Sequence, residues 1–146
     1  MEFTDIAMEL SKEAWQASFH HPFVLQLQEG TLEPSIFRYY LIQDAYYLKS
    51  FSEAYHLLAD KTSNQEMKRL LKQNAQSLVE GELFIRQQFF MELGISDQEM
   101  EQHPIAPTCY HYISHIYRQF AEPNLGIAFA SLLPCPWLYH DLGKAL

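Results

Sequence analysis

The feature that most constrains the fold is a helical spacing of large side chains along the whole chain. It is clearest between Pro34 and Asp60, where four positions at i, i+4, i+7 and i+11 are occupied by Tyr40, Asp44, Tyr47 and Phe51. Residues at this spacing share one face of an α-helix, because each residue turns the helix by about 100°. No alternating strand pattern bounded by turn residues occurs. The sequence therefore predicts an all-α fold.

Prolines, glycines and capping residues mark where the helices begin and end. The expected helices are Thr4 or Asp5 to about His20, Pro22–Glu29, Pro34 to about Asp60, Ser63 or Asn64 to Leu93, Ser96–Gln102, about Thr108–Ala121, Pro123–Leu133, and a last helix that starts near Pro136.

The fourth of these helices has an apolar stripe of its own. The residues expected to be buried are Met67, Leu71, Leu78, Ile85 and Phe89. Glu82 projects from the same stripe, and a buried Tyr, Arg or His is its expected partner. Gly81 costs about 1 kcal/mol relative to alanine in a helix interior. A close crossing of two helices would explain it.

Asp44 is a single carboxylate on an aromatic helix face, and a buried aspartate needs a partner. One interpretation is structural, with the carboxylate held by a tyrosine hydroxyl or a backbone amide. The other is functional, with the carboxylate binding a polar group of a ligand that lies among aromatic side chains. The stripe alone favours neither.

The segment Leu133–Tyr139 reads Leu-Pro-Cys-Pro-Trp-Leu-Tyr. Proline is favoured at the first position of a helix, so Cys135 is expected at the mouth of a helix that starts near Pro136. A helix N-terminus favours the thiolate form of cysteine. Cys135 and Tyr139 are at i and i+4 and face the same way. An inert, packed cysteine is the structural alternative, and local evidence alone favours it.

Composition excludes several classes of protein. At 146 residues we expect one domain, residues 1–146. The net charge of −8 argues against a nucleic-acid partner. Cys109 and Cys135 are too few for a disulfide scaffold, and reduced thiols indicate the cytoplasm. The acidic start is not that of a signal peptide, and no apolar run is long enough to span a membrane.

Three other site types were compared with the residues. A di-metal site in a helical bundle needs two Glu-x-x-His pairs and two more carboxylates. One such pair occurs, Glu53 and His56, on the side of its helix opposite Asp44. No histidine is singled out as a haem ligand. No serine lies on a glycine-flanked turn of the kind that hydrolases use.

Three segments together resemble the TenA family of thiaminase II enzymes, which share the helical fold of haem oxygenase-like proteins. They are Arg38-Tyr39-Tyr40-Leu41-Ile42-Gln43-Asp44-Ala45-Tyr46-Tyr47-Leu48, Val79-Glu80-Gly81-Glu82, and Leu133-Pro134-Cys135-Pro136-Trp137-Leu138-Tyr139. The resemblance covers the whole chain, and the first and third segments together are specific.

The resemblance implies a hydrolase of thiamin and pyrimidine salvage. Such an enzyme converts an aminomethyl aminopyrimidine to a hydroxymethylpyrimidine and cleaves thiamin. It implies Cys135 as the nucleophile, Asp44 as the pyrimidine-binding carboxylate, and pocket residues Tyr47, Tyr112 and Tyr139. No metal and no organic cofactor is expected. The partner is a small-molecule pyrimidine or thiamin, and the family's oligomer is a tetramer.

The sequence departs from the family pattern at its end. It still reads as amphipathic helix at Leu146, so we expect a C-terminally truncated bundle without the family's later catalytic glutamate and pocket tyrosine. Weak or absent turnover and strong self-association are the corresponding expectations. Two hypotheses follow: a salvage enzyme with Cys135 as nucleophile, or a non-catalytic relic or pyrimidine-binding, regulatory module of the same fold.

Overall fold

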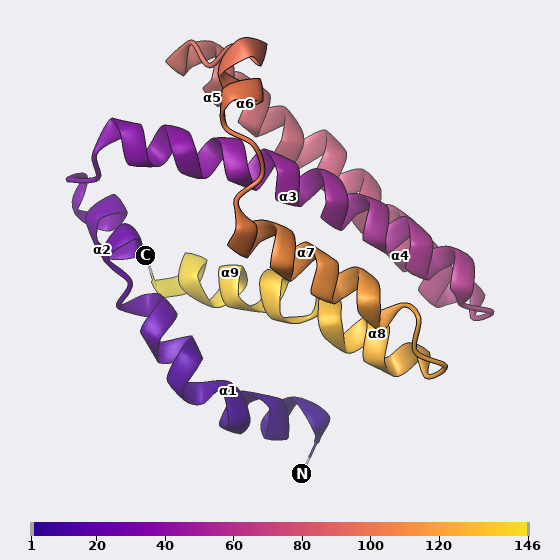
Figure 1. The fold of residues 1–146 in the computed structure, drawn as a ribbon. Coiled ribbons are helices and arrows are strands. Elements are labelled where there is room, and N and C mark those ends of the chain that lie inside the picture. Colours follow the sequence, from indigo (N-terminus) through magenta and orange to yellow (C-terminus); the bar gives the residue numbers. More distant parts are fainter. Residues whose placement is uncertain (1, 146) are drawn as a thin grey trace. The chain divides into compact units, whose positions relative to one another are not determined.

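A computed structural model describes residues 2–145, and this part of the chain is helical with no strand (Figure 1). The helices are α1 Phe3–Phe19, α2 Pro22–Glu29, α3 Pro34–Lys61, α4 Gln65–Ser77, the π-helix η1 Leu78–Leu83, α5 Phe84–Leu93, α6 Asp97–Gln102, α7 Pro107–Gln119, α8 Leu125–Leu132 and α9 Pro134–Ala145. The all-α prediction is confirmed. The predicted continuation of the last helix to Leu146 lies outside the described residues.

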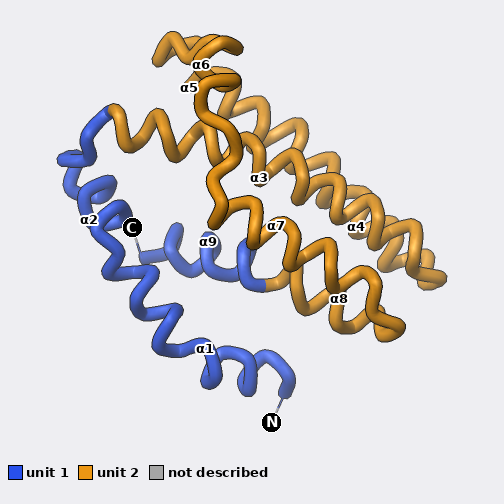
Figure 2. Tube along the Cα trace, in the orientation of Figure 1, with its two compact units in different colours: residues 1–34, 134–146 blue, residues 35–133 orange. Residues whose placement is uncertain are grey.

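The chain forms two compact units (Figure 2). Unit 1 contains the described residues of 1–34 and 134–146, which are α1, α2 and α9. Unit 2 contains residues 35–133, from α3 to α8. That residues 1–146 form one domain stays a prediction.

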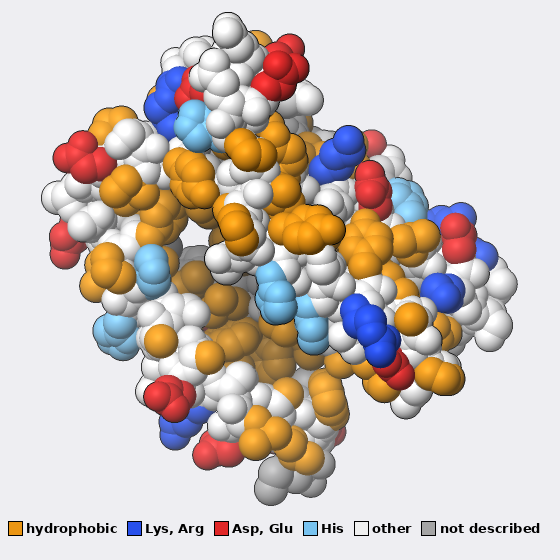
Figure 3. Space-filling model, in the orientation of Figure 1, with side chains coloured by type: hydrophobic (Ala, Val, Ile, Leu, Met, Phe, Trp, Pro, Cys, Tyr) orange, Lys and Arg blue, Asp and Glu red, His pale blue; other side chains and the backbone are white. Residues whose placement is uncertain are grey.

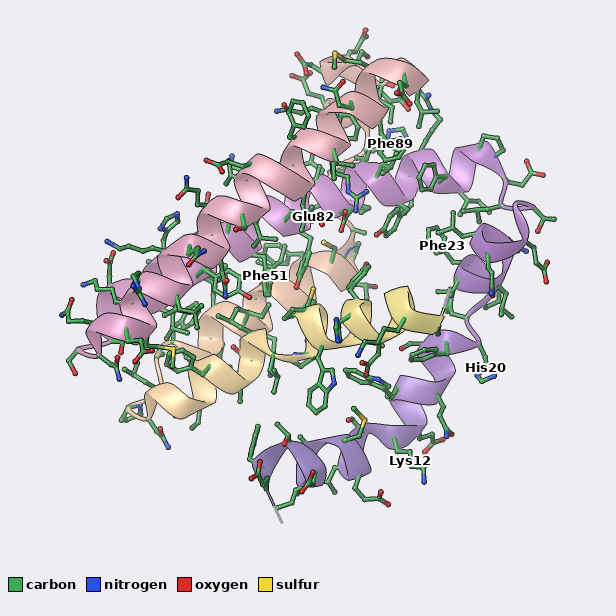
Figure 4. All side chains as sticks on the ribbon, turned by 180° about the vertical axis from the view of Figure 1, so that it is seen from behind. Lys12, His20, Phe23, Phe51, Glu82 and Phe89 are labelled. Carbon is green, nitrogen blue, oxygen red and sulfur yellow. The ribbon has the colours of Figure 1, made fainter. Side chains whose placement is uncertain are left out.

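Helix α3 provides much of the core of unit 2, and α4 runs alongside it (Figure 1 and Figure 4). The Ser52 hydroxyl donates to the Ala75 carbonyl across this contact at 3.3 Å. The residues of α3 that are buried are Leu41, Ile42, Gln43, Asp44, Leu48, Phe51, Ser52, Ala54, Tyr55, Leu58 and Ala59. Burial of this many apolar side chains on one helix makes α3 the element against which the others are placed.

The predicted fourth helix is interrupted by the π-helix Leu78–Leu83. A π-helix turns less per residue than an α-helix, so it shifts the inward-facing positions that follow. The predicted burial of Ile85 and Glu82 is therefore wrong, since Ile85 is 45% exposed and the Glu82 side chain 51%. Arg86 is turned inward instead, with a side chain 16% exposed. Figure 4 shows Glu82 and, further along, Phe89, which packs edge-on against Phe37 at 5.8 Å.

Unit 1 is held by a contact between its first and last helices. The rings of Trp15 and Trp137 meet edge to face at 5.6 Å, and the Trp15 indole N–H donates to Asp141 Oδ2 at 3.2 Å. Trp137 and Asp141 are at i and i+4, so they lie on one face of α9. Figure 4 shows Lys12 on α1, His20 directly after α1 and Phe23 on α2 in this unit.

Several predicted boundaries are confirmed and others are wrong by a few residues. Asn64 caps α4 by accepting from the Met67 N–H at 3.0 Å, as predicted. Helix α1 instead begins at Phe3, because the Glu2 N–H donates to Asp5 Oδ2 at 3.0 Å. Helix α8 begins after Asn124, which caps it, and not at Pro123.

Helix α9 begins at Pro134, not near Pro136 as predicted. Both prolines fit the first turn of a helix, because the N–H groups of that turn have no partner within the helix. Cys135 is therefore the second residue of α9 and still lies at its N-terminus.

The charged side chains on the surface are of both signs. On the face drawn in Figure 3, basic side chains are interspersed with acidic and uncharged ones. Across the described residues, none of the helices combines the length and apolarity needed to cross a membrane.

Substitution of Gly94 tests the role of its backbone conformation. Gly94 ends α5 at φ 63°, which is energetically unfavourable for a residue with a side chain. Gly94→Ala should therefore lower the free energy of unfolding by about 1 kcal/mol.

Gly81 is the opposite case. A Cβ on Gly81 would meet no described atom within 4 Å, so a close helix crossing does not explain this glycine. Gly81→Ala should raise the free energy of unfolding by up to about 1 kcal/mol. Urea titration measures both, and equal shifts of the same sign would contradict the argument.

Candidate functional site

The centre of the candidate site is the carboxylate of Asp44, which is 9% exposed on α3. Its partner is Arg86, whose Nε donates to Asp44 Oδ2 at 2.5 Å. The prediction that Asp44 is buried is confirmed. This partner is a cation that lies 42 residues away in the sequence.

Arg86 is itself fixed from three sides. Its Cζ lies 5.7 Å from the centre of the Tyr40 ring, in a cation–π arrangement. Its Nη2 lies 3.9 Å from Glu82 Oε2, a weaker ion pair within the same helical segment. Glu82 thus has an arginine partner, as expected, although it is not directed inward. Burial raises the pKa of Asp44 above its ordinary value, and the charge and hydrogen bond of Arg86 oppose that rise.

Two of the predicted pocket tyrosines lie together in unit 2. The rings of Tyr47 and Tyr112 are stacked, with centroids 5.7 Å apart and planes 7° apart. Phe51 stacks on Tyr47 at 5.2 Å and 22°. The three rings form one continuous aromatic wall, which begins three residues along α3 from Asp44.

Gln43, which the sequence analysis did not single out, positions the start of α7. Its side chain donates from Nε2 to the Pro104 carbonyl at 3.1 Å and accepts at Oε1 from the Ala106 N–H at 2.7 Å. The loop before α7 is thereby fixed to α3, and α7 carries Tyr112. These two hydrogen bonds of the Gln43 side chain therefore fix the position of Tyr112 relative to Tyr47.

The two cysteines have different surroundings. Cys109, on α7, directs its thiol to the Gln43 carbonyl at 3.8 Å. Burial, followed by the negative charge of Asp44, raises the pKa of the Cys109 thiol, so it stays protonated and a poor nucleophile. Cys135 lies in the first turn of α9, where the helix dipole favours a thiolate.

Cys135 and Tyr139 belong to unit 1, whereas Asp44, Tyr47 and Tyr112 belong to unit 2. On α9, Cys135 and Tyr139 are about 200° from Trp137 and Asp141. They therefore lie on the opposite face from the one that contacts α1.

Metal chemistry finds no support in the described part of the chain. Within residues 2–145 no group of three or more His, Cys, Asp and Glu side chains is arranged to hold a metal ion. Glu53 and His56, the one Glu-x-x-His pair, are both exposed.

Comparison with known proteins identifies the family of the chain. The model of the TENA/THI-4/PQQC family matches residues 10–145. The chain belongs to this family.

Its relatives include an aminopyrimidine aminohydrolase of Bacillus subtilis, 35% identical over 146 residues, of which the chain covers 62%. Aminopyrimidine aminohydrolases of Halalkalibacterium halodurans and Staphylococcus aureus are 27% and 29% identical, with 65% and 64% of their lengths covered. The chain itself is covered over 100%, 100% and 99% of its length in these three matches. It therefore spans somewhat under two thirds of the length of these relatives.

Solved structures show the same fold. A TenA family transcription regulator from Silicibacter sp. TM1040 superposes with a TM-score of 0.90 at 26% identity, over 99% of this chain and 64% of that one. A TenA homologue from P. horikoshii OT3 gives 0.88 at 26% identity, over 99% and 67%.

The sequence reasoning missed Arg86 and Gln43 for different reasons. Glu82 and Arg86 at i and i+4 were a visible signal, but regular helix geometry directs Ile85 inward, and only the π-helix reverses this. Gln43 gave no signal, because its partners are backbone groups more than 60 residues away.

The Gln43 bonds generate a prediction. Gln43→Met keeps the length of the side chain but removes both hydrogen bonds, so the free energy of unfolding should fall by about 2 kcal/mol. Stacking of Tyr112 on Tyr47 should weaken as well, which near-ultraviolet circular dichroism detects. The control is Gln87→Met, the same change at an exposed position of α5, which should shift stability by less than about 0.5 kcal/mol. Equal effects at the two positions would refute the role of Gln43.

Proposed function

We propose that this protein is a hydrolase of thiamin and pyrimidine salvage. Its substrate is an aminomethyl aminopyrimidine, which it converts to a hydroxymethylpyrimidine, and it also cleaves thiamin. Membership of the family and relatives named aminopyrimidine aminohydrolase support this proposal. The observation that carries it is the buried, arginine-paired Asp44 next to the stacked rings of Tyr47 and Tyr112. A flat aromatic ring with polar edges is the ligand that such a surface fits.

The proposed site residues are Cys135 as nucleophile, Asp44 as the pyrimidine-binding carboxylate, and Tyr47, Tyr112 and Tyr139 as pocket residues. Two observations support the choice of Cys135 as nucleophile. Cys135 and Tyr139 lie on the face of α9 that is opposite its contact with α1, and Cys135 is at a helix N-terminus. Cys109, the other cysteine, has a raised pKa. The nucleophile is therefore assigned to Cys135.

The proposed reaction begins when the Cys135 thiolate adds to an electron-poor carbon of the pyrimidine ring. The electrons of the ring then expel the amine from the exocyclic methylene, and the amine takes up a proton and leaves as ammonia. Water adds to the methylene and loses a proton, which gives the hydroxymethyl group. The thiolate departs and the aromatic ring is restored. Asp44 binds the ring amino group or a protonated ring nitrogen and stabilises the positive charge that makes the ring electrophilic.

The partners follow from this chemistry. The ligand is a small-molecule pyrimidine or thiamin, no cofactor takes part, and nucleic acid and membranes are not partners. A reduced Cys135 fits a cytoplasmic protein. A homo-oligomer, with the tetramer as its expected form, belongs to the same proposal.

Cysteine labelling tests the assignment. An aminopyrimidine that carries a bromomethyl group should alkylate Cys135 at least about tenfold faster than Cys109, because burial keeps the Cys109 thiol protonated. Mass spectrometry of peptides locates the label. Asp44→Asn should slow labelling of Cys135, since the ring is then held less tightly. Labelling of both cysteines at equal rates would contradict the assignment.

Turnover separates the enzyme from its alternative. Cys135→Ser should abolish release of ammonia from the aminomethyl aminopyrimidine, while Cys109→Ser should retain the rate of the unchanged chain, even where that rate is low. Calorimetry of the same variants gives pyrimidine affinity. Binding without product, unchanged by Cys135→Ser, would identify a pyrimidine-binding module in place of an enzyme.

A further inference from the structure

We propose that Arg86 is a specificity-determining residue, which makes the site select pyrimidines with a ring amino group over those with a ring oxo group. It does so by holding Asp44 as an oriented carboxylate that only accepts hydrogen bonds. The inference rests on the proposed function, because it assumes that Asp44 faces the pyrimidine ring.

The first step is how Arg86 comes to face Asp44. A regular α-helix would direct Ile85 and Glu82 toward α3, but the π-helix Leu78–Leu83 shifts the inward positions by one residue. π-Helical segments are rare and occur frequently at functional sites. A regular helix would place an apolar side chain at the inward position that Arg86 occupies. Removing an arginine from water is costly, so its presence there indicates a specific role.

The second step is the geometry of the pair. Nε of Arg86 donates to Oδ2 of Asp44, and Nη2 lies 3.9 Å from Glu82 Oε2. The Cζ atom of Arg86 lies 5.7 Å from the centre of the Tyr40 ring. Arg86 thus directs its hydrogen bond to one carboxylate oxygen, and we assign the other oxygen, Oδ1, to the pyrimidine.

The third step is what Oδ1 can bind. A charged carboxylate is an acceptor only, whereas a protonated one is also a donor. An N–H of a ring amino group matches the charged form. A ring oxo group would place its oxygen against a carboxylate oxygen, and two acceptors facing each other are a mismatch that a binding site strongly rejects.

The fourth step concerns the charge of Asp44. The charged and titratable groups that act on it or respond to it are Arg86 of α5, Glu82 of the π-helix and Cys109 of α7. On its own helix, Tyr40 precedes it by four residues and Tyr47 follows it by three. Burial and Glu82 favour the protonated carboxyl, and Arg86 is the cation that opposes both. Without Arg86 the carboxyl becomes protonated at higher pH and can then donate to an oxo group.

The experiment compares Arg86→Met with Arg86→Lys and with the control Glu80→Gln, a change at an exposed position of the π-helix. Calorimetry measures the affinity of each for an aminomethyl aminopyrimidine and for the analogue in which a ring oxo group replaces the ring amino group. The unchanged chain should prefer the amino ring by at least about tenfold. Arg86→Met should reduce that preference to about threefold or less at neutral pH, and more acidic buffer should reduce it further. Arg86→Lys should retain part of the preference, because lysine keeps the charge but not the directed Nε bond. Glu80→Gln should retain all of it.

The outcomes separate the two proposals. If the unchanged chain binds neither ring, the proposed function fails. If it prefers the amino ring and Arg86→Met keeps that preference, only the role of Arg86 fails. Circular dichroism confirms that each variant is folded. Should Arg86→Met unfold, Arg86→Lys decides, because a preference equal to that of the unchanged chain together with an unchanged pH profile would overturn the inference.

Discussion

The pairing of a buried carboxylate with a buried guanidinium is the interaction on which unit 2 depends. Removing Asp44 from water is costly, and a single unpaired carboxylate in the core would protonate or unfold the site. Arg86 compensates for that cost from another helix, with Tyr40 beneath it and Glu82 beside it. Because the pair joins α3 to the segment after the π-helix, it also fixes how these elements pack. One contact therefore links the fold of the unit to the chemistry of its candidate site.

The π-helix explains both a failure of sequence reasoning and the site itself. A strict 3.6-residue period directs Ile85 inward, and the structure has Ile85 half exposed with Arg86 buried. This π-helical register is unfavourable for an isolated helix, because a π-helix is a rare conformation and because the register leaves the apolar Ile85 side chain in solvent. The ion pair with Asp44 stabilises it. The ion pair between residues of two helices has therefore overridden the helical pattern of the local sequence.

Contacts between residues that are close in the sequence could be predicted from it, whereas contacts between distant residues could not. Gly30, Gly94 and Asn64 act through neighbouring backbone groups, so their helix ends could be read directly. The burial of Asp44 followed from the stripe of α3. Its partner could not be read, because that contact spans 42 residues and depends on an irregular turn.

The loop bonds of Gln43 show the same limit even more clearly. Both partners are backbone groups, which carry no side-chain signature that a pattern in the sequence could match. A glutamine on a helix is also ordinarily exposed, so burial of Gln43 was not indicated by its type. Contacts of this kind are visible only once the loop before α7 has been placed against α3.

The contrast between the two cysteines gives a physical reason for the division of the proposed site. A carboxylate that binds an electron-poor ring raises the pKa of any thiol beside it, and Cys109 shows this effect of Asp44. A thiol close to the anchor is therefore a poor nucleophile, even though it is near the ring. A nucleophile that must be a thiolate is better supplied by an element with its own source of positive potential, and the N-terminus of α9 provides one for Cys135. Under the proposed function, binding the ring and attacking it require opposite electrostatic environments, so the anchor and the nucleophile are assigned to different residues, Asp44 and Cys135.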